Sequence, residues 1–306
     1  MLVLQADRKI GAKETKLLAG KLLDEDSFDT LIEQDCNVVT ESGDHLLHFR
    51  KAVIPQNYIK DAYTNIKQAA IPTNNRGVAS GYIDENKLPT SVAKNRNWNN
   101  DNSIDSDFLV TPNGSKTHQS NVVMSGIMGY MDRYARIPYC RTTAYNMEHP
   151  ERFRQAMPFI TAVNNVFGDV SPERYAAQHA IIKQTHPDFT IHNTVFTTIT
   201  VNKNWQTAVH TDKGDYAEGL GVMSAMWKGT GDGCYFVFPA YRIGVNMRTG
   251  DVLCANVHEW HGNTPFKGVV GRYERIACVF YYRNKMKNCG SAAEELERSK
   301  QGIRTS

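Results

Sequence analysis

A histidine and an aspartate two positions apart, His210 and Asp212, are the residues whose types and spacing point most directly to chemistry. In an extended segment, residues i and i+2 lie on the same face, so an imidazole and a carboxylate can reach one ion together. Two protein ligands hold a metal poorly, and a second histidine from a later strand would complete a face of two histidines and one carboxylate. Such a face leaves coordination positions open and suits non-haem Fe(II). The competing interpretation is a polar turn.

Candidates for the third ligand lie in the later segment Val257–Asn263, which contains His258 and His261. This segment follows a turn at Thr249–Asp251 and a short apolar stretch. Its His-Glu-Trp-His order differs from the His-Glu-x-x-His helix of zinc proteases, because the spacing is one residue shorter and the context is not helical. Spacing alone leaves both histidines open as the third ligand.

An Fe(II) face with open positions needs an organic co-substrate that supplies electrons, and the common one is 2-oxoglutarate. Its distal carboxylate needs a buried cation, and arginine pairs with carboxylates through two parallel hydrogen bonds. Arg275 fits this role, because it opens the apolar segment Arg275–Tyr281, where a guanidinium would otherwise be poorly placed. The alternative is that Arg275 extends its charged end into solvent from the end of a strand.

The elements that must position these side chains are strands, because the hydrophobic period in the last third of the chain is two. Thr194–Asn202 alternates and is rich in β-branched residues, which predicts a strand. Further strands are expected at Gly221–Trp227, Cys234–Pro239, Arg242–Met247, Val252–Asn256 and Arg275–Arg283. Several short strands separated by turn signals predict a sandwich or jelly roll with the helices packed outside it.

Helices are expected before these strands, at Lys16–Leu23, Tyr58–Ala70, His149–Phe167 and from Ser171 to about Gln184. The third helix carries apolar residues at three- and four-residue steps, and Pro158 should kink or split it. The fourth helix opens with Ser171 as its N-cap and Pro172 in its first turn.

Between the second and third helices lies an irregular segment, Thr73–Asn121, which is rich in Asn with Gly, Ser, Asp and Pro. A structureless segment of this length is either disordered or functional. We expect a mobile surface loop. The alternative is a loop that grips the substrate, with Arg76, Lys94, Arg96 and Trp98 meeting phosphates and bases.

Composition limits the class of protein. The chain has 306 residues, of which 41% are hydrophobic and 22% charged, so a globular fold with a sizeable core is expected. Its apolar runs are far shorter than the roughly 20 residues of a membrane span, and the N-terminus lacks the apolar region of a signal peptide. We therefore expect an intracellular protein that is neither secreted nor bound to membranes. A net charge of +3 permits nucleic-acid binding without arguing for it.

The sequence contains 6 cysteines, with no Cys-x-x-Cys pair among them. A zinc ribbon is therefore not expected. We expect all of them to be buried free thiols in a reducing compartment.

Several segments together resemble a known family. They are Cys140–Ala144, Phe196–Asn202, His210–Asp215, Val245–Asp251, His258–Asn263, and the tail TPFK…RIACVFYYRNKM. In this order and at these spacings they are similar to the TET/J-binding-protein family of Fe(II)/2-oxoglutarate-dependent DNA 5-methylpyrimidine dioxygenases. The resemblance covers about residues 120–288, more than half of the chain.

The resemblance implies an α+β fold with a double-stranded β-helix (jelly-roll) core, flanking helices and a long irregular N-terminal segment. It divides the chain into an N-terminal extension that packs on the core (1–119, with a polar loop at about 73–121), the dioxygenase core (120–290) and a C-terminal tail (291–306). The implied cofactors are Fe(II), 2-oxoglutarate and O₂. The implied partner is DNA with the target base flipped out.

By position, the resemblance assigns His210 and Asp212 as the first two iron ligands. It assigns His261, and not His258, as the third. Arg275 matches the family's arginine for 2-oxoglutarate.

The same resemblance assigns three residues to the target base. Asp215 contacts it, Tyr281 stacks on it, and Arg283 takes the place of a polar contact that is histidine in the TET enzymes. A methyl group inside duplex DNA cannot reach iron, so the base must leave the stack, and stacking on an aromatic side chain can return about 1–3 kcal/mol. The alternative for Tyr281 is a plain core residue. Ala277 departs from a serine that helps to bind 2-oxoglutarate in some TET proteins.

The function predicted is therefore hydroxylation of the 5-methyl group of a pyrimidine in DNA, with 5-methylcytosine slightly preferred over thymine. One alternative keeps the chemistry but acts on a protein side chain or a free nucleotide. Another is a non-catalytic DNA-binding module on the same scaffold, which would have no need of an iron face.

Overall fold

The computed structural model describes residues 2–81, 109–110, 116–117, 121–134 and 137–302. Its strands are β1 Leu2–Ala6, β2 Thr30–Ile32, β3 Cys36–Thr40, β4 His45–Arg50, β5 Ile71–Thr73, β6 Leu109–Val110, β7 Lys116–Thr117, β8 Val123–Met131, β9 Arg141–Thr142, β10 Thr198–Lys203, β11 Gly221–Gly229, β12 Asp232–Gly233, β13 Phe236–Phe238, β14 Ile243–Val245, β15 Val252–Ala255, β16 Gly262–Asn263, β17 Phe266–Lys267 and β18 Tyr273–Tyr281. Its α-helices are α1 Ala12–Lys16, α2 Gln56–Ile66, α4 Ala144–Glu148, α5 Pro150–Val170, α6 Pro172–Ile182 and α7 Ala292–Gly302.

Most strands belong to one large sheet or one small sheet, while β12 pairs with β17 and β6 with β7 in separate two-stranded sheets. The large sheet runs in the order β1-β3-β4-β15-β11-β18-β10-β8-β5, with β9 paired to β8, and the small sheet in the order β16-β13-β14-β2. Strand β18 lies between β11 and β10 and pairs antiparallel with both. The strands of the sequence-predicted core and those from the first 73 residues therefore belong to the same large sheet.

Each central strand of the large sheet separates two hydrophobic cores, because alternate side chains point to opposite faces. On β11, Val222 and Met226 join the core beneath the helices, while Met223 and Ala225 join the core shared with the small sheet. On β18, Ile276, Cys278 and Phe280 lie in the core beneath the helices. The intervening positions, from Arg275 to Tyr281, therefore face the interior between the two sheets.

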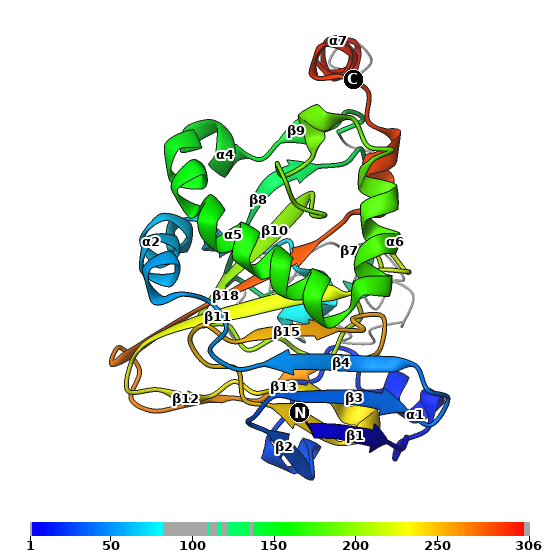
Figure 1. Ribbon diagram of the computed structural model, residues 1–306, viewed down its shortest axis with the longest axis vertical. Helices are drawn as coiled ribbons and strands as arrows, with labels where there is room; N and C mark the ends of the chain where they lie inside the picture. Colours follow the sequence, from blue (N-terminus) through cyan, green and yellow to red (C-terminus); the bar gives the residue numbers. More distant parts are fainter. Residues whose placement is uncertain (1, 82–108, 111–115, 118–120, 135–136, 303–306) are drawn as a thin grey trace.

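The helices cover the other face of the large sheet (Figure 1). Helix α5 lies across β10, β18 and β11 with α2 beside it, and its residues Phe159, Ile160 and Val163 are almost fully buried. Helix α7 projects from the top of the molecule, at the end away from the small sheet. The interior between the sheets is left for the polar residues of the candidate site.

The strands predicted for the last third of the chain are confirmed as β10, β11, β13, β14, β15 and β18, with ends that shift by a few residues. The predicted helices at Tyr58–Ala70, His149–Phe167 and after Ser171 correspond to α2, α5 and α6. Helix α5 does not split at Pro158, which lies on its exposed side, where water can satisfy the carbonyl that loses its partner.

The helix predicted at Lys16–Leu23 is wrong. Helix α1 ends at Lys16, and the chain turns through Gly20, which adopts a left-handed φ of 77°. The Gly20 N–H donates a hydrogen bond to the carbonyl of Val209, at 2.8 Å. A contact with a segment distant in sequence thus fixes this turn, and glycine adopts the left-handed conformation with little strain because it has no Cβ.

Strand β8 is an element that the sequence pattern did not indicate. Its sequence, VMSGIMGYM, contains two glycines, which weaken the signal for a strand. A side chain at Gly126 would collide with the carbonyl of Ala69, and Gly129 has a φ of +86° against the carbonyl of Thr197. Close approach of neighbouring backbone therefore requires both glycines within a strand that is otherwise paired on both sides.

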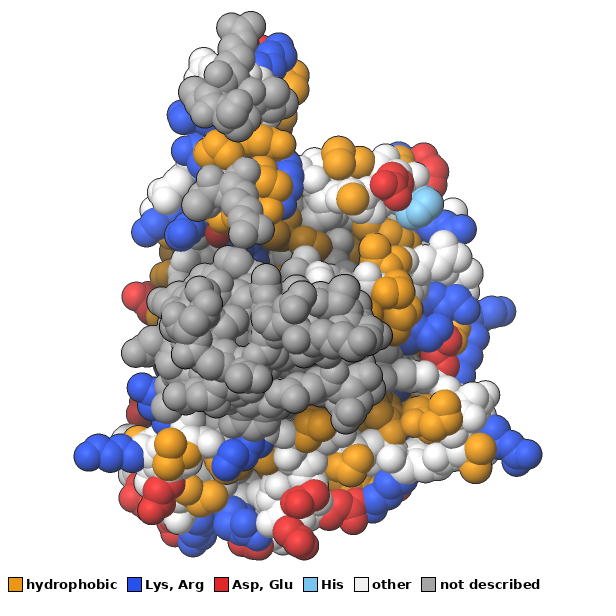
Figure 2. All heavy atoms as spheres, turned by 180° about the vertical axis from the view of Figure 1, so that it is seen from behind, with side chains coloured by type: hydrophobic (Ala, Val, Ile, Leu, Met, Phe, Trp, Pro, Cys, Tyr) orange, Lys and Arg blue, Asp and Glu red, His pale blue; other side chains and the backbone are white. Residues whose placement is uncertain are grey.

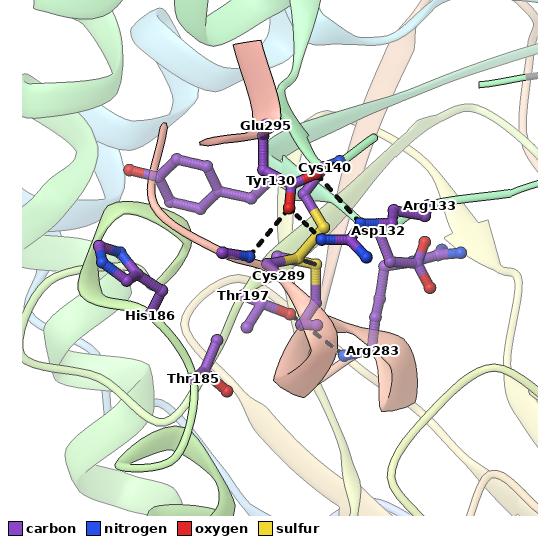
Figure 3. The surroundings of a disulfide bond; sticks show 12 residues. Tyr130, Asp132, Arg133, Cys140, Thr185, His186, Thr197, Arg283, Cys289 and Glu295 are labelled. Carbon is purple, nitrogen blue, oxygen red and sulfur yellow. Dashed lines mark hydrogen bonds and ion pairs between the residues drawn. A yellow bond between two sulfur atoms is a disulfide. The ribbon is translucent and has the colours of Figure 1, made fainter. Parts of the chain in front are cut away.

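The cysteines follow the prediction only in part. Cys36, Cys234, Cys254 and Cys278 are buried free thiols, as expected. Cys140 and Cys289 form a disulfide across a sequence separation of 149 residues (Figure 3), so the prediction is wrong for this pair. Spacing along the chain carries no sign of such a pairing, because the fold alone brings the two thiols together.

Among the described residues, no helix combines the length and the apolar character that crossing a bilayer requires.

Candidate metal centre

His210 and His261 are brought together by a short backbone ladder. Each donates its backbone N–H to the other's carbonyl, at 2.9 and 3.0 Å, as an isolated antiparallel bridge. His261 directly precedes β16, which pairs with β13 of the small sheet. The pairing places the two imidazole rings 4.4 Å apart, centroid to centroid.

Asp212 closes the group. One of its carboxylate oxygens lies 3.6 Å from Nε2 of His210, and the other lies 3.7 Å from Nε2 of His261. The candidate ligand atoms of the three residues all lie within 4.8 Å of one another. The same-face argument for positions 210 and 212 therefore holds in the folded chain.

Both imidazoles are oriented so that Nε2 is the free nitrogen. Nδ1 of His210 lies 2.7 Å from the carbonyl oxygen of Ala208, and Nδ1 of His261 lies 2.9 Å from that of Glu259. A carbonyl oxygen only accepts, so each Nδ1 is the donor and each Nε2 keeps its lone pair. Hydrogen bonds of this kind commonly fix the tautomer and orientation of histidines that bind metals.

His261 is only 4% exposed and stacks on Phe236, with ring centroids 5.1 Å apart. Burial, and then the neighbouring His210, lower the pKa of His261 to about 4. The ring is therefore neutral at physiological pH, which is the form that a metal requires. Two imidazole nitrogens with free lone pairs and one carboxylate are ligands that suit a divalent transition metal such as Fe(II).

His258 lies apart from this group. Its Nε2 points to the carbonyl oxygen of Tyr216, at 3.5 Å, and it belongs to no metal-competent cluster among the described residues. Of the two histidines that spacing left open, the structure therefore brings His261 to His210 and Asp212.

Arg275 provides a buried cation on the face of β18 that looks into the interior between the sheets. The residue is 5% exposed, and its guanidinium lies over the ring of Trp227, 5.7 Å from the centroid. Its Nε is buried without a hydrogen-bond partner, and Arg275 forms no ion pair with any described residue. A buried guanidinium without an anion is costly, so this site is suited to an anionic ligand.

Tyr281, Arg283 and Asp215 lie at the opposite end of β18 from Arg275. Tyr281 is 7% exposed, and its hydroxyl lies 3.0 Å from Oγ1 of Thr200 on β10. Asp215 and Arg283 face each other as an isolated antiparallel bridge. The structure thus brings the three residues expected at the base to one end of the interior. Tyr281 is buried there, so its alternative interpretation as a core residue stays open.

Burial, and then the charge of Asp212, raise the pKa of Asp215 well above its ordinary range, while Arg283 opposes the shift.

Arg76 and Asp132 also reach this end of the interior. Arg76 has a buried Nε without a hydrogen-bond partner among the described residues, and burial lowers the pKa of its guanidinium, with smaller effects from Tyr281, Arg283 and Asp212. The sequence named it as a residue for phosphates or bases, and its place near these three residues could not be inferred from the pattern. Asp132, directly after β8, pairs with Arg283 and was missed altogether. The other loop residues named for this role, Lys94, Arg96 and Trp98, lie outside the described residues.

The group of two histidines and one aspartate, together with a buried arginine between two β-sheets, is the arrangement expected in a 2-oxoglutarate- and Fe(II)-dependent oxygenase. Residues 126–284 match the Tet_JBP family, described as the oxygenase domain of the 2OGFeDO superfamily. The match covers more than half of the chain, which therefore belongs to this family.

Two curated relatives are named thymine dioxygenase. The chain is 36% identical to thymine dioxygenase JBP1 of Leishmania braziliensis over 187 residues, which are 58% of this chain and 22% of that protein. It is 36% identical to the Trypanosoma brucei brucei protein of the same name over 165 residues, which are 52% of this chain and 19% of that one. This chain thus spans about a fifth of the length of these relatives.

Among solved structures, NgTET1 in complex with 5mC DNA matches with a TM-score of 0.54. The match covers 89% of this chain and 86% of that one, at 11% sequence identity. At this identity the likeness shows a shared fold alone, with mixed sheets and helices.

Proposed function

We propose that this chain is an Fe(II)/2-oxoglutarate-dependent dioxygenase that hydroxylates the 5-methyl group of a pyrimidine in DNA. The observation that carries the proposal is the convergence of the His210, Asp212 and His261 ligand atoms within 4.8 Å. It is supported by the buried Arg275, whose Nε has no hydrogen-bond partner among the described residues. Bound iron supplies the activation of O₂, which couples decarboxylation of 2-oxoglutarate to succinate and CO₂ with transfer of one oxygen atom to a C–H bond.

In this proposal the protein's own residues hold and orient the reactants. Arg275 pairs with the distal carboxylate of 2-oxoglutarate, and the dry interior strengthens that pairing. Tyr281 stacks on the flipped base, while Asp215 and Arg283 contact its polar edge. We propose the two sheets as the double-stranded β-helix of the family. We keep the division into extension (1–119), core (120–290) and tail (291–306) as part of the proposal.

The choice of base has two candidates. The sequence favours 5-methylcytosine slightly, through its TET-like tail. The relatives at 36% identity are named thymine dioxygenases, which favours thymine. Asp215 does not separate the two bases, because its carboxylate can accept a hydrogen bond from the 4-amino group of cytosine or from N3 of thymine.

We propose that DNA binds mainly through contacts of the flipped base with its pocket, and less through attraction of the phosphates to a positively charged surface. The net charge is only +3, and on the face of Figure 2 the visible Lys and Arg side chains alternate with Asp and Glu along its lower part. Sequence-independent affinity for DNA grows with the number of phosphates that the protein neutralises. A surface of mixed charge neutralises few of them and therefore contributes little affinity of this kind.

The deciding experiment is mass spectrometry of nucleosides after DNA is incubated with the chain, Fe(II) and 2-oxoglutarate. Duplexes that contain thymine alone, or thymine with 5-methylcytosine, are compared, with omission of 2-oxoglutarate as the control. Formation of a 5-hydroxymethyl pyrimidine supports the proposal and identifies the base. Succinate release without any modified nucleoside, in the presence of either duplex, would contradict it.

A further inference from the structure

Arg283 is held at both ends by residues from elsewhere in the fold (Figure 3). Its backbone N–H donates to Oγ1 of Thr197, at 3.1 Å, and its Nε donates to a carboxylate oxygen of Asp132, at 2.8 Å. Asp132 is 5% exposed, and within the described part of the chain Arg283 is its only ion-pair partner. A charged hydrogen bond in so dry a place is strong and directional.

Arg283 pairs with Asp132 although a second acidic residue, Asp215, is its neighbour. Asp215 and Arg283 are direct neighbours in a backbone bridge, yet their side chains form no ion pair within 4.0 Å, whereas Arg283 and Asp132 do. No described residue accepts a hydrogen bond from the terminal nitrogens of Arg283. Among the described residues, only the Nε of the guanidinium is held, and its terminal nitrogens can donate to a ligand.

We propose that Asp132 is a positioning residue that keeps Arg283 from pairing with Asp215, so that both can contact the flipped pyrimidine. Without a charge at position 132, the guanidinium would be drawn to the next buried acid within reach, because an unpaired buried cation is costly. An Asp215–Arg283 pair would use up the donors and acceptors that the base needs. This inference rests on the proposed function for the role of the two residues, but the contact itself is independent of it.

The contact can be tested without turnover. The Nε–H group of Arg283 gives a side-chain NMR signal, assigned by its loss in Arg283→Lys. We expect slow exchange with water in the native chain. In Asp132→Asn, which keeps the shape and one acceptor oxygen, we expect a shifted signal and exchange faster by about tenfold or more, since a neutral hydrogen bond is weaker. An unchanged signal would overturn the proposal.

Turnover then tests the consequence. Asp132→Asn should raise KM for DNA by about tenfold, the worth of one charged hydrogen bond, with a smaller change in kcat. It should also change the ratio of 5-methylcytosine to thymine turnover, while succinate release without DNA stays the same. In an Arg283→Ala background, the same substitution should have no further effect, which a merely structural role for Asp132 would not predict.

Asp251→Asn is the matched control. Asp251 is 1% exposed and accepts hydrogen bonds from the backbone N–H groups of Ala52, after β4, and of Arg248, in the turn before β15. This variant therefore undergoes the same chemical change at an equally buried site. It should lose stability without changing the base ratio.

An equal effect of Asp132→Asn with and without Arg283 would overturn the positioning role. A native chain that oxidises no DNA would instead contradict the proposed function, and the NMR result would still decide the contact.

Discussion

At the scale of single residues, the site depends on which nitrogen of each histidine is free. The backbone carbonyls of Ala208 and Glu259 take the Nδ1 protons of His210 and His261, so both lone pairs converge with the Asp212 carboxylate. Three neutral or anionic ligands on one face leave the remaining positions of an octahedral ion for other molecules. Under the proposed assignment, replacing any of the three would remove a metal ligand and not merely a nearby polar group.

We expect His261→Ala to lose iron and turnover, because two remaining ligands hold the metal poorly. His258→Ala is the control, since this histidine lies three positions away and contacts the Tyr216 carbonyl instead. Iron content after desalting and succinate production would be measured for both variants. Loss of iron from His258→Ala with retention in His261→Ala would reverse the ligand assignment.

We expect Arg275→Ala to raise the 2-oxoglutarate concentration needed for half-maximal turnover by about a hundredfold or more, because the co-substrate's buried carboxylate would lose its partner. Iron binding should be unchanged. Arg272→Ala is the control, since Arg272 is exposed and lies just before the same strand. A normal 2-oxoglutarate titration for Arg275→Ala would exclude this residue from the site.

At the scale of elements, the hydrophobic period of two predicted strand β18. The same rule failed for β8, whose glycines are required by the carbonyls of Ala69 and Thr197. Spacing could place His210 and Asp212 on one face, because they are local. It could not choose between His258 and His261, nor find Asp132, because those contacts exist only once distant strands pair.

A buried histidine on strand β4, His48, should make the stability of the fold depend on pH. His48 is 2% exposed, its Nε2 has no hydrogen-bond partner, and burial, followed by His45, lowers its pKa to about 4. Below pH 6.5 the unfolded chain takes up a proton that the native chain refuses until about pH 4. Stability should therefore fall across this window as the pH falls, by at most about 3 kcal/mol from this residue.

Urea unfolding at pH 7 and pH 4.5 would measure this effect. We expect His48→Gln to lose less stability between the two pH values than the native chain does. His192→Gln, at an exposed histidine, should behave as the native chain does. Equal losses for all three proteins would mean that His48 does not carry this dependence.

The disulfide joins the segment after β8 to the segment after β18, beside an ion pair between the half-buried Arg133 and the buried Glu295. Closing a loop of 149 residues restricts the unfolded chain, an effect worth at most about 5 kcal/mol in the chain-entropy model. We expect the double variant Cys140→Ser, Cys289→Ser to melt at a lower temperature than the oxidised chain. A reductant should lower the Tm of the native chain and leave that of the double variant unchanged. Equal Tm values for the two oxidised samples would contradict this role.

At the scale of the whole molecule, the N-terminal strands continue the sheet that carries the site. Strand β4 pairs with β15, β15 with β11, and β11 with β18, which bears Arg275. Leu47 and Phe49 of β4 are fully buried in the core shared by the two sheets. The residues that match the family begin at 126, so the family region by itself lacks one side of its own sheet.

A chain that starts at residue 121 should therefore fail to fold alone. It would expose the edge of β15 and leave Leu253 and Cys254, now fully buried, open to solvent. Removing even one large buried side chain such as Phe49 costs about 3–5 kcal/mol, and a typical domain has only about 5–15 kcal/mol in total. We expect the truncated chain to be insoluble or molten by near-UV circular dichroism, and co-expression of residues 1–120 to restore a soluble complex that binds iron. A truncated chain that folds and binds iron unaided would show that residues 1–119 are a separable extension, because the core would then close without the strand that covers β15.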